Sequence, residues 1–302
     1  MKFSLIVPTL NRVREVARLL QSLVAQDYKH FEVIVVDQNS DDRLVDLVAA
    51  YSHHFPILHL REPKRGQSRA RNIGFSHVHG DIVAFPDDDC LYSEGLLTRI
   101  VQFFEQNAKF DGIITRVYDL DEDKNAFEPC GDDQSQEIDY AKGYKVCVSC
   151  AMFFRAHIAE KIAFDEMLGP GAGTPWGCGD ESDYLFRCLN AGFRFYYDAT
   201  LIVRHPNPLK MNSLREQFRR EYSYGLGKGY FLATHHLPQS LLRSELSEPY
   251  RYTPLEIFRG NWGRACYFLV NGMGTSLGYL AGLKRCREIK RTMLNGGCHG
   301  NW

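Results

Sequence analysis

The sequence predicts an α/β protein in which a mainly parallel sheet is flanked by helices and followed by a C-terminal helical extension. Short apolar runs alternate with stretches of helical periodicity over residues 1–205, which is typical of βαβ units with right-handed crossovers. Three of these runs end at Pro8, Asp37 and Asp87. Ligands of such sheets bind outside the carboxyl ends of the strands, so we expect the functional site there.

The expected elements follow one another in order. Residues 2–7 form a continuous apolar run, as a central parallel strand requires, and residues 13–25 repeat apolar side chains at helical spacing. Further strands are expected at 31–36, 57–60, 82–85, 112–115, 147–154, 193–197 and 201–203. Further helices are expected at 42–51, 67–77, 94–107, 181–191 and 213–224, and residues 118–143 are expected to form an acidic variable loop.

Composition restricts the class of protein. The 302 residues are 44% hydrophobic and 24% charged, as in an ordinary globular chain, and the net charge of −1 provides no basic field for nucleic acid. Nine scattered cysteines favour free thiols in a reducing compartment, and Cys147 and Cys150 lack the second pair of a zinc site. With no signal peptide evident, we expect a cytoplasmic protein, either free or at the cytoplasmic face of the membrane.

Three consecutive aspartates, Asp87, Asp88 and Asp89, follow the apolar run 82–85. Carboxylates at the end of a strand can hold Mg²⁺ or Mn²⁺, and such an ion usually binds substrate phosphates as well. The alternative is a polar turn that caps the next helix. A lone histidine after a strand, His205, is a further candidate metal ligand, although most histidines in that position are structural.

Two further groups extend this edge of the sheet. Asp37 ends the second strand, where its carboxylate can accept a hydrogen bond from a base or a ribose; a turn aspartate is the alternative. Arg71 and Asn72 lie on the helix that follows a tight glycine turn, and an arginine there can clamp a phosphate. A solvated helix face is the alternative for this segment.

A second acidic cluster opens the helix near residue 181 after a glycine-rich segment, residues 169–179. Acids are favourable at a helix N-terminus, so capping alone explains Asp180. The glycine-rich segment predicts a mobile loop whose Trp176 stacks on a sugar. A carboxylate at its end, Asp180 or Glu181, is suited to act as a general base.

Six blocks, in order along residues 1–205, together resemble the family 2 glycosyltransferases of GT-A fold: 6–11, 35–37, 70–74, 80–81, 87–89 and 179–183. The resemblance implies metal-dependent, inverting transfer from a nucleotide sugar, with Asp87, Asp89 and His205 as metal ligands. It implies Glu181 as catalytic base, although the swapped order of Asp180 and Glu181 leaves both open. The residues that it assigns to nucleotide-sugar binding are Pro8, Thr9, Asn11, Asp37, Arg71, Asn72, Asp87, Asp88 and Trp176.

The expected reaction moves a sugar from a nucleotide-diphosphate donor, with a UDP-sugar favoured, to a glycan or lipid-linked acceptor in cell-surface polysaccharide synthesis. A non-catalytic nucleotide-sugar-binding module and a nucleotidyltransferase-like enzyme are the alternatives. The glycine-rich loop that a nucleotidyltransferase needs after the first strand is missing, and so is the G-x-G-x-x-G motif of a dinucleotide-dependent oxidoreductase.

The C-terminal part differs from the rest of the chain. We expect a catalytic domain at 1–208 and a helical region at 209–302. Residues 265–283 carry no charge, and Gly274, Gly278 and Gly282 have the spacing of membrane helix contacts. Basic residues follow, as on an anionic membrane surface. The alternatives are peripheral membrane contact through 265–291, a packed soluble helix, and a membrane span.

Overall fold

The computed structural model describes residues 1–127, 132–207, 213–235 and 237–296. The chain divides into two compact units. The first comprises Met1–Glu166 and Tyr184–Met211, and the second comprises Met167–Asp183 and Asn212–Trp302. The predicted boundary at residue 208 lies close to the second passage between units, whereas the sequence did not indicate that residues 167–183 belong with the C-terminal helices.

The described residues of the first unit form one sheet with the strand order β3-β2-β1-β4-β8-β6-β9-β5, and β7 pairs with β9. The strands are β1 (Phe3–Thr9), β2 (Phe31–Asp37), β3 (Ile57–Arg61), β4 (Ile82–Ala84), β5 (Leu91–Tyr92), β6 (Gly112–Asp119), β7 (Gln136–Glu137), β8 (Met152–Arg155) and β9 (Phe195–His205). The first four strands of this order are mutually parallel, as predicted. Because β8 runs antiparallel to β4 and β6, the sheet as a whole is mixed.

The strand directions decide where the polar strand ends meet. Because β8 is antiparallel to both β4 and β6, β6 runs in the same direction as β4 and β1. Strand β9 is parallel to β6. The carboxyl ends of β1, β2, β4, β6 and β9 therefore share one edge of the sheet. Cα pairing places Thr9 opposite Asp37 and Asp119 opposite His205 at this edge.

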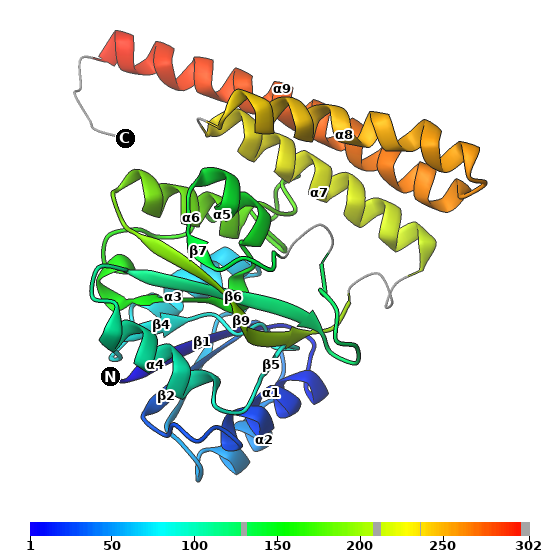
Figure 1. Ribbon diagram of the computed structural model, residues 1–302. Coiled ribbons are helices and arrows are strands. Elements are labelled where there is room, and N and C mark those ends of the chain that lie inside the picture. The colour runs from blue at the N-terminus through cyan, green and yellow to red at the C-terminus, as the bar shows by residue number, and fades with distance from the viewer. Residues whose placement is uncertain (128–131, 208–212, 236, 297–302) are drawn as a thin grey trace. The chain divides into compact units, whose positions relative to one another are not determined.

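Helices cover both faces of the sheet (Figure 1). One face carries α1 (Arg14–Val24), α2 (Val45–Tyr51) and α4 (Leu96–Gln106). The other carries α3 (Gln67–Phe75), α5 (Tyr140–Val146) and the part of α6 (Asp180–Asn190) that belongs to this unit. The predicted apolar face of α1 is buried, because Val16, Leu19, Leu20 and Leu23 recur at helical spacing.

Three expectations about the middle of the chain were wrong. Residues 118–143 contain β7 and the start of α5, which the side chain of Asp139 caps by accepting a hydrogen bond from the Lys142 backbone N–H. Residues 147–154 do not form one strand, because a 3₁₀ turn, η1 (Ser149–Ala151), precedes β8. A second 3₁₀ turn, η2 (Ala156–Ile158), follows β8. The two predicted closing strands are one strand, β9, interrupted by a register shift opposite Thr115 and Arg116.

The second unit is built on α7 (Leu214–Thr234), α8 (Gln239–Phe258) and α9 (Trp262–Gly296). Its α7 and α9 backbones approach so closely at several glycines that no side chain fits at those positions. A methyl group at Gly229 would lie 2.0 Å from the carbonyl oxygen of Thr275, and one at Gly278 would lie 2.0 Å from that of Leu226. The glycines that suggested contacts between membrane helices therefore serve packing within this chain.

Polar side chains of residues 265–283 also find partners inside this unit. Asn271 Nδ2 donates to Glu221 at 3.2 Å, Thr275 Oγ1 donates to the Asn271 carbonyl, and Ser276 pairs with the Tyr250 hydroxyl. No helix within the described ranges contains a stretch that is both long and apolar enough to span a bilayer. These contacts are those of a helix packed within its own unit, and peripheral membrane contact through residues 265–291 stays a prediction.

Candidate functional site

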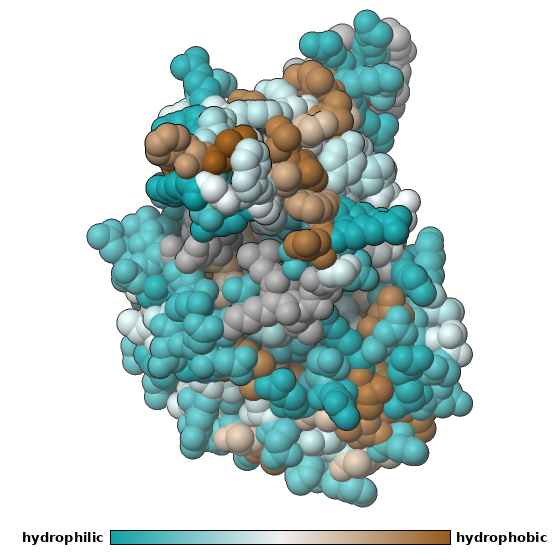
Figure 2. All heavy atoms as spheres, turned by 90° about the vertical axis from the view of Figure 1, so that its right-hand side faces the viewer, coloured by the Kyte–Doolittle hydropathy of each residue, from teal (hydrophilic) through white to brown (hydrophobic). Residues whose placement is uncertain are grey.

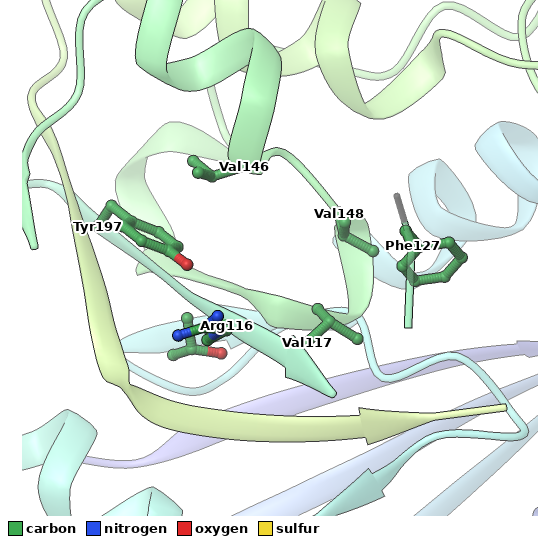
Figure 3. A pocket seen from close by; sticks show the side chains of 7 residues that line it. Arg116, Val117, Phe127, Val146, Val148 and Tyr197 are labelled. Carbon is green, nitrogen blue, oxygen red and sulfur yellow. The ribbon is translucent and has the colours of Figure 1, made fainter. Parts of the chain in front are cut away.

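The enclosed cavity of the first unit is not a ligand site. It lies between β6, β9 and the segment that joins α5 to β8, with Phe127, Val148 and Tyr197 around it (Figure 3). Its volume is about 10 Å³, which is room for one water molecule at most. A shallow hollow beside Met1 and Asp81 lies at the amino ends of β1 and β4. The candidate carboxylates lie at the opposite edge of the sheet.

Asp87, Asp88 and Asp89 follow β4 at the carboxyl edge. Arg12, in the turn after β1, forms an ion pair with Asp88 at 2.8 Å and a second one with Asp89. Burial raises the pKa of Asp88 to about 7, even with Arg12 beside it. Burial acts on Asp89 in the same direction, but the charges and hydrogen bonds of His205 and Arg12 outweigh it and lower the pKa of Asp89 to about 2.

His205, the last residue of β9, reaches the same carboxylates. Its Nε2 lies 3.2 Å from Asp89 Oδ1 and 3.8 Å from Asp87 Oδ2. Its Nδ1 lies 2.7 Å from the Pro206 carbonyl oxygen, to which it donates. Burial lowers the pKa of His205, but Asp89 and Asp87 outweigh that effect and raise it overall. With Nδ1 committed to a carbonyl, the imidazole directs Nε2 toward the aspartates.

These residues suit a divalent cation in their chemistry but are not arranged as a finished coordination shell. Two carboxylates and an imidazole are donors that Mn²⁺ accepts and Mg²⁺ accepts in part. Among the residues that the structure describes, no group of three or more His, Cys, Asp or Glu side chains is set to hold a metal ion. Arg12 and His205 instead balance the negative charge of Asp88 and Asp89.

Asp37 is fully buried at the end of β2. Its Oδ1 accepts from the backbone N–H and the side-chain amide of Asn39, at 2.8 and 2.6 Å. Its Oδ2 lies 2.9 Å from His59 Nε2 and 3.4 Å from Arg61. His59 and Arg61 were not among the residues expected at the site, although their alternation on β3 puts both on one face of a strand beside β2.

The turns after β1 and β2 are joined at this edge. The Asn11 backbone N–H donates to Asn39 Oδ1 at 2.7 Å, and Asn11 adopts a left-handed φ of 60°. Asparagine tolerates this conformation better than most residues. Pro8 and Thr9 are buried at the end of β1, so Asn11 is the exposed member of this predicted trio.

Arg71 and Asn72 have partners that the sequence did not reveal. Arg71 is fully buried, donates to Ser149 Oγ at 2.7 Å and lies 3.4 Å from Asp87 Oδ1. Its guanidinium stacks over Phe164. Asn72 bonds both the backbone N–H and the carbonyl of Phe164. Arg71 is thus held beside Asp87, and its role as a phosphate clamp stays a prediction.

The acidic cluster of the second unit begins α6. Gly169 folds over Asp180 with φ of 93°, and a methyl group at Gly169 would lie 2.7 Å from the Asp180 carboxyl carbon. Asp180 is buried, whereas Glu181 is half-buried. Asp183 forms an ion pair with His235 at 2.9 Å, which ties the start of α6 to the end of α7. Of the two candidate bases, Glu181 is the more accessible.

The glycine-rich segment before α6 is held against α7. The Gly177 backbone N–H donates to the Ser223 carbonyl, and Ser223 Oγ donates to the Pro175 carbonyl. The Trp176 ring stacks on Tyr230, with ring centroids 4.7 Å apart. These contacts hold the segment against its own unit, and one face of Trp176 is already occupied by an aromatic partner. The mobility of the loop and the stacking of Trp176 on a sugar stay predictions.

A mixed sheet of this order, with carboxylates at its carboxyl edge and a helical C-terminal region, has the fold of the GT-A glycosyltransferases. The chain superposes on the crystal structure of Staphylococcus aureus TarS residues 1–349 in complex with UDP-GlcNAc, with a TM-score of 0.58 at 15% identity, covering 95% of this chain and 92% of that one. It superposes on the mannosyltransferase PcManGT from Pyrobaculum calidifontis, in complex with GDP-Man and Mn²⁺, with a TM-score of 0.61 at 16% identity, covering 97% and 80%.

Residues 4–162 match the model of glycosyl transferase family 2, and the chain belongs to that family. An uncharacterized glycosyltransferase of Haemophilus influenzae is 38% identical over 111 residues, which cover 36% of this chain and 37% of that protein. The poly(ribitol-phosphate) beta-N-acetylglucosaminyltransferase TarS of S. aureus is 32% identical over 111 residues, which cover 35% of this chain and 19% of TarS. The matched part thus spans about a third or less of these relatives' length.

Proposed function

We propose that the protein is a metal-dependent, inverting glycosyltransferase. It moves a sugar from a nucleotide-diphosphate donor, a UDP-sugar first among the candidates, to a hydroxyl of a glycan or lipid-linked acceptor in cell-surface polysaccharide synthesis. The supporting observation is that Asp87 and Asp89, which follow β4, and His205, which ends β9, converge at the sheet edge where Asp37 ends β2. Family membership and the donor complexes of similarly folded proteins support the same reaction class.

In this proposal Asp87, Asp89 and His205 hold Mn²⁺ or Mg²⁺. When bound, the ion supplies positive charge to the diphosphate that leaves. Arg71 acts as a positioning residue, because its contacts with Ser149 and Asp87 fix the Asp87 carboxylate. Asn72 has a similar role through the Phe164 backbone.

The donor nucleotide contacts the ends of β1 and β2 in this proposal, through Pro8, Thr9, Asn11 and Asp37. The hydrogen bonds to both oxygens of Asp37 fix the orientation of its carboxylate, so that it presents a constant acceptor to the N–H of a base. In the same proposal, Asp88 contacts the ribose and phosphate part of the donor. Trp176, already stacked on Tyr230, supports the sugar with its remaining edge or face.

The acceptor hydroxyl gives its proton to Glu181 as its oxygen attacks the anomeric carbon. Glu181 is favoured over Asp180 because it is half-buried and therefore reachable, whereas Gly169 covers Asp180. A cytoplasmic location is part of the proposal, and the seven cysteines within the described ranges form no disulfide with one another.

Donor screening tests the proposal directly. Melting temperature should rise with one class of nucleotide sugar, and more so with Mn²⁺, because a ligand that binds the folded state stabilises it. The same donor should release its nucleotide slowly in the presence of Mn²⁺. A non-catalytic binding module would show the stabilisation without any nucleotide release, and the absence of both signals over a full donor panel would refute donor binding.

The base assignment has its own test. Glu181→Gln should lower transfer by about 10²–10⁴-fold, the usual contribution of a positioned base, and should keep donor affinity. Glu160→Gln, an exposed glutamate of the first unit, is the matched control and should transfer normally. If Asp180→Asn causes the larger loss while Glu181→Gln keeps its turnover, the two roles must be exchanged.

A further inference from the structure

The outer face of α9 carries an exposed apolar stripe within the helical unit. The stripe, defined by Trp262, Leu269, Met273, Leu277 and Leu280, repeats at steps of three, four and seven residues. Residues at such steps lie on one side of a helix. All five side chains are exposed, Trp262 by 66% and Leu280 by 61%. A soluble helix normally turns such a stripe toward a core.

The side of α9 that packs against the rest of the helical unit is opposite to the stripe. Gly274, Gly278 and Gly282 lie against the backbone of α7. They alternate with the stripe along the helix and fall on the opposite face. The stripe is therefore additional to the packing that builds the unit, and its exposure is not explained by that packing.

The apolar surface continues around the turn from α8 to α9. Phe258, the last residue of α8, is 90% exposed, more than any other large apolar side chain in the described residues. It precedes Trp262 by one helical turn of sequence. Figure 2 shows hydrophobic side chains gathered over the end of the helical unit that contains this turn. An exposed Trp at a helix turn has the amphipathic form of side chains found at membrane interfaces, and the exposed Phe adds apolar area that can enter the bilayer.

Basic residues extend the stripe toward the C-terminus. Lys284, Arg287 and Arg291 continue its spacing and are exposed. Residues 249–291 contain eight Lys and Arg but only two Glu, in a chain whose net charge is −1. One face of α9 thus changes from apolar to cationic along its length, which complements a surface that is apolar inside and anionic outside.

We propose that this surface, formed by Phe258, the apolar stripe and the basic residues that continue it, docks the protein on an anionic lipid bilayer. Phe258 and Trp262 enter the interface while the cationic end binds lipid headgroups. Pairing with a second copy is less compatible with the charges. Parallel stripes would oppose two cationic ends, and antiparallel stripes would set each cationic end on an apolar half. The inference rests on the exposed surface and does not require the proposed transfer activity.

The experiment is flotation of the full chain with vesicles of phosphatidylcholine alone and of phosphatidylcholine with phosphatidylglycerol. Binding should require the anionic lipid and weaken as salt screens the basic residues. The double variant Phe258→Ser/Trp262→Ser should reduce partitioning by about tenfold or more, since two large apolar side chains no longer enter the bilayer. Val45→Ser/Leu58→Ser removes two exposed apolar side chains of the first unit and should bind as the wild type does.

Three outcomes would overturn the proposal. They are failure of the wild type to float with anionic vesicles, equal flotation of the Phe258→Ser/Trp262→Ser variant, and a stable dimer by light scattering that this variant dissociates. The last outcome would assign the surface to a second copy. Thermal melting checks that the variant is folded, and Trp262 quenching by brominated lipid in wild-type protein, compared with Trp262→Phe, provides a readout that does not rely on that variant. Donor-dependent stabilisation measured on the same samples keeps this result separate from that of the proposed activity.

Discussion

The carboxyl edge of the sheet and the α7–α9 contact bring chain segments together by opposite means. At the sheet edge, charged side chains from segments far apart in the sequence meet and compensate one another, as Arg12, Asp89 and His205 do. Between α7 and α9, glycines let the two backbones approach closely, and carbonyl oxygens occupy the space that a Cβ atom would need. The first arrangement keeps charged groups available for chemistry, and the second keeps a scaffold together. Substitutions should therefore alter activity in one region and stability in the other.

The largest effect is expected at the sheet edge. Asp89→Asn removes a charged ligand from the proposed metal site and should weaken the Mn²⁺-dependent affinity for the nucleotide sugar by about 10²-fold. Because Asp89 also pairs with Arg12 and His205, the melting temperature without ligand should fall as well. Asp46→Asn, an exposed aspartate on α2, should leave both quantities unchanged. Retention of the full Mn²⁺ effect in Asp89→Asn would remove this residue from the proposed site.

The next effect is on the scaffold. Gly278→Val places branched carbons against the Leu226 carbonyl, which no rotamer avoids, and should lower the free energy of unfolding by about 3 kcal/mol or more. Gly263→Ala, in the same helix, meets no atom within 4 Å and should be neutral or stabilise by up to about 1 kcal/mol. Chemical denaturation measures both. Equal stability of the two variants would mean that the α7–α9 approach is looser than described.

The smallest expected effects are on the pH dependence of stability. Glu221 of the second unit and Glu32 of the first unit should shift it in opposite directions. Burial raises the pKa of Glu221, in α7, above its ordinary value of 4.5. The stability associated with Glu221 is therefore full below pH 4.5 and is lost as pH rises through the folded-state value. Glu221→Gln should make the protein more stable than the wild type at neutral pH but not at pH 4.

Glu32, on β2, behaves in the reverse way. Burial would raise its pKa, but hydrogen bonds from Lys2 and Ser4 outweigh burial and lower it below 4.5. Its stabilisation is therefore present above pH 4.5 and is lost as pH falls through the folded-state value. Glu32→Gln should reduce stability at neutral pH, and the difference from the wild type should shrink in acid. Melting curves across pH 3–8 test both glutamates, and parallel curves for the two variants would contradict the assigned signs.

Local patterns in the sequence predicted the first half of the fold well. β1, β2 and α1 have uniform apolar runs or a clear helical period, and Asp37 and Asp87 follow strands whose direction the βαβ pattern determines. The partners of these residues could not be predicted in the same way. Arg12 and His205 are 77 and 116 positions from Asp89, and only the strand order brings them together.

The C-terminal glycines illustrate a different limit. Spacing such as that of Gly274, Gly278 and Gly282 indicates that a helix can approach another backbone, but it does not specify the solvent around the pair. The other backbone belongs to α7, about 50 residues earlier, where Gly225 and Gly229 supply the complementary surface. Similarly, α5 was missed because its buried members include Lys142 and Gly143, which break an apolar period.

Arg12 has a consequence for ion selectivity at the sheet edge. Because its guanidinium is covalently tethered beside Asp88 and Asp89, these carboxylates already have a resident cation. Any ion from solution has to compete with this tethered group, whose effective concentration is high. At the proposed metal site, weakly held monovalent ions such as Na⁺ and K⁺ should therefore lose that competition, and a doubly charged ion should gain enough from the carboxylates to win it.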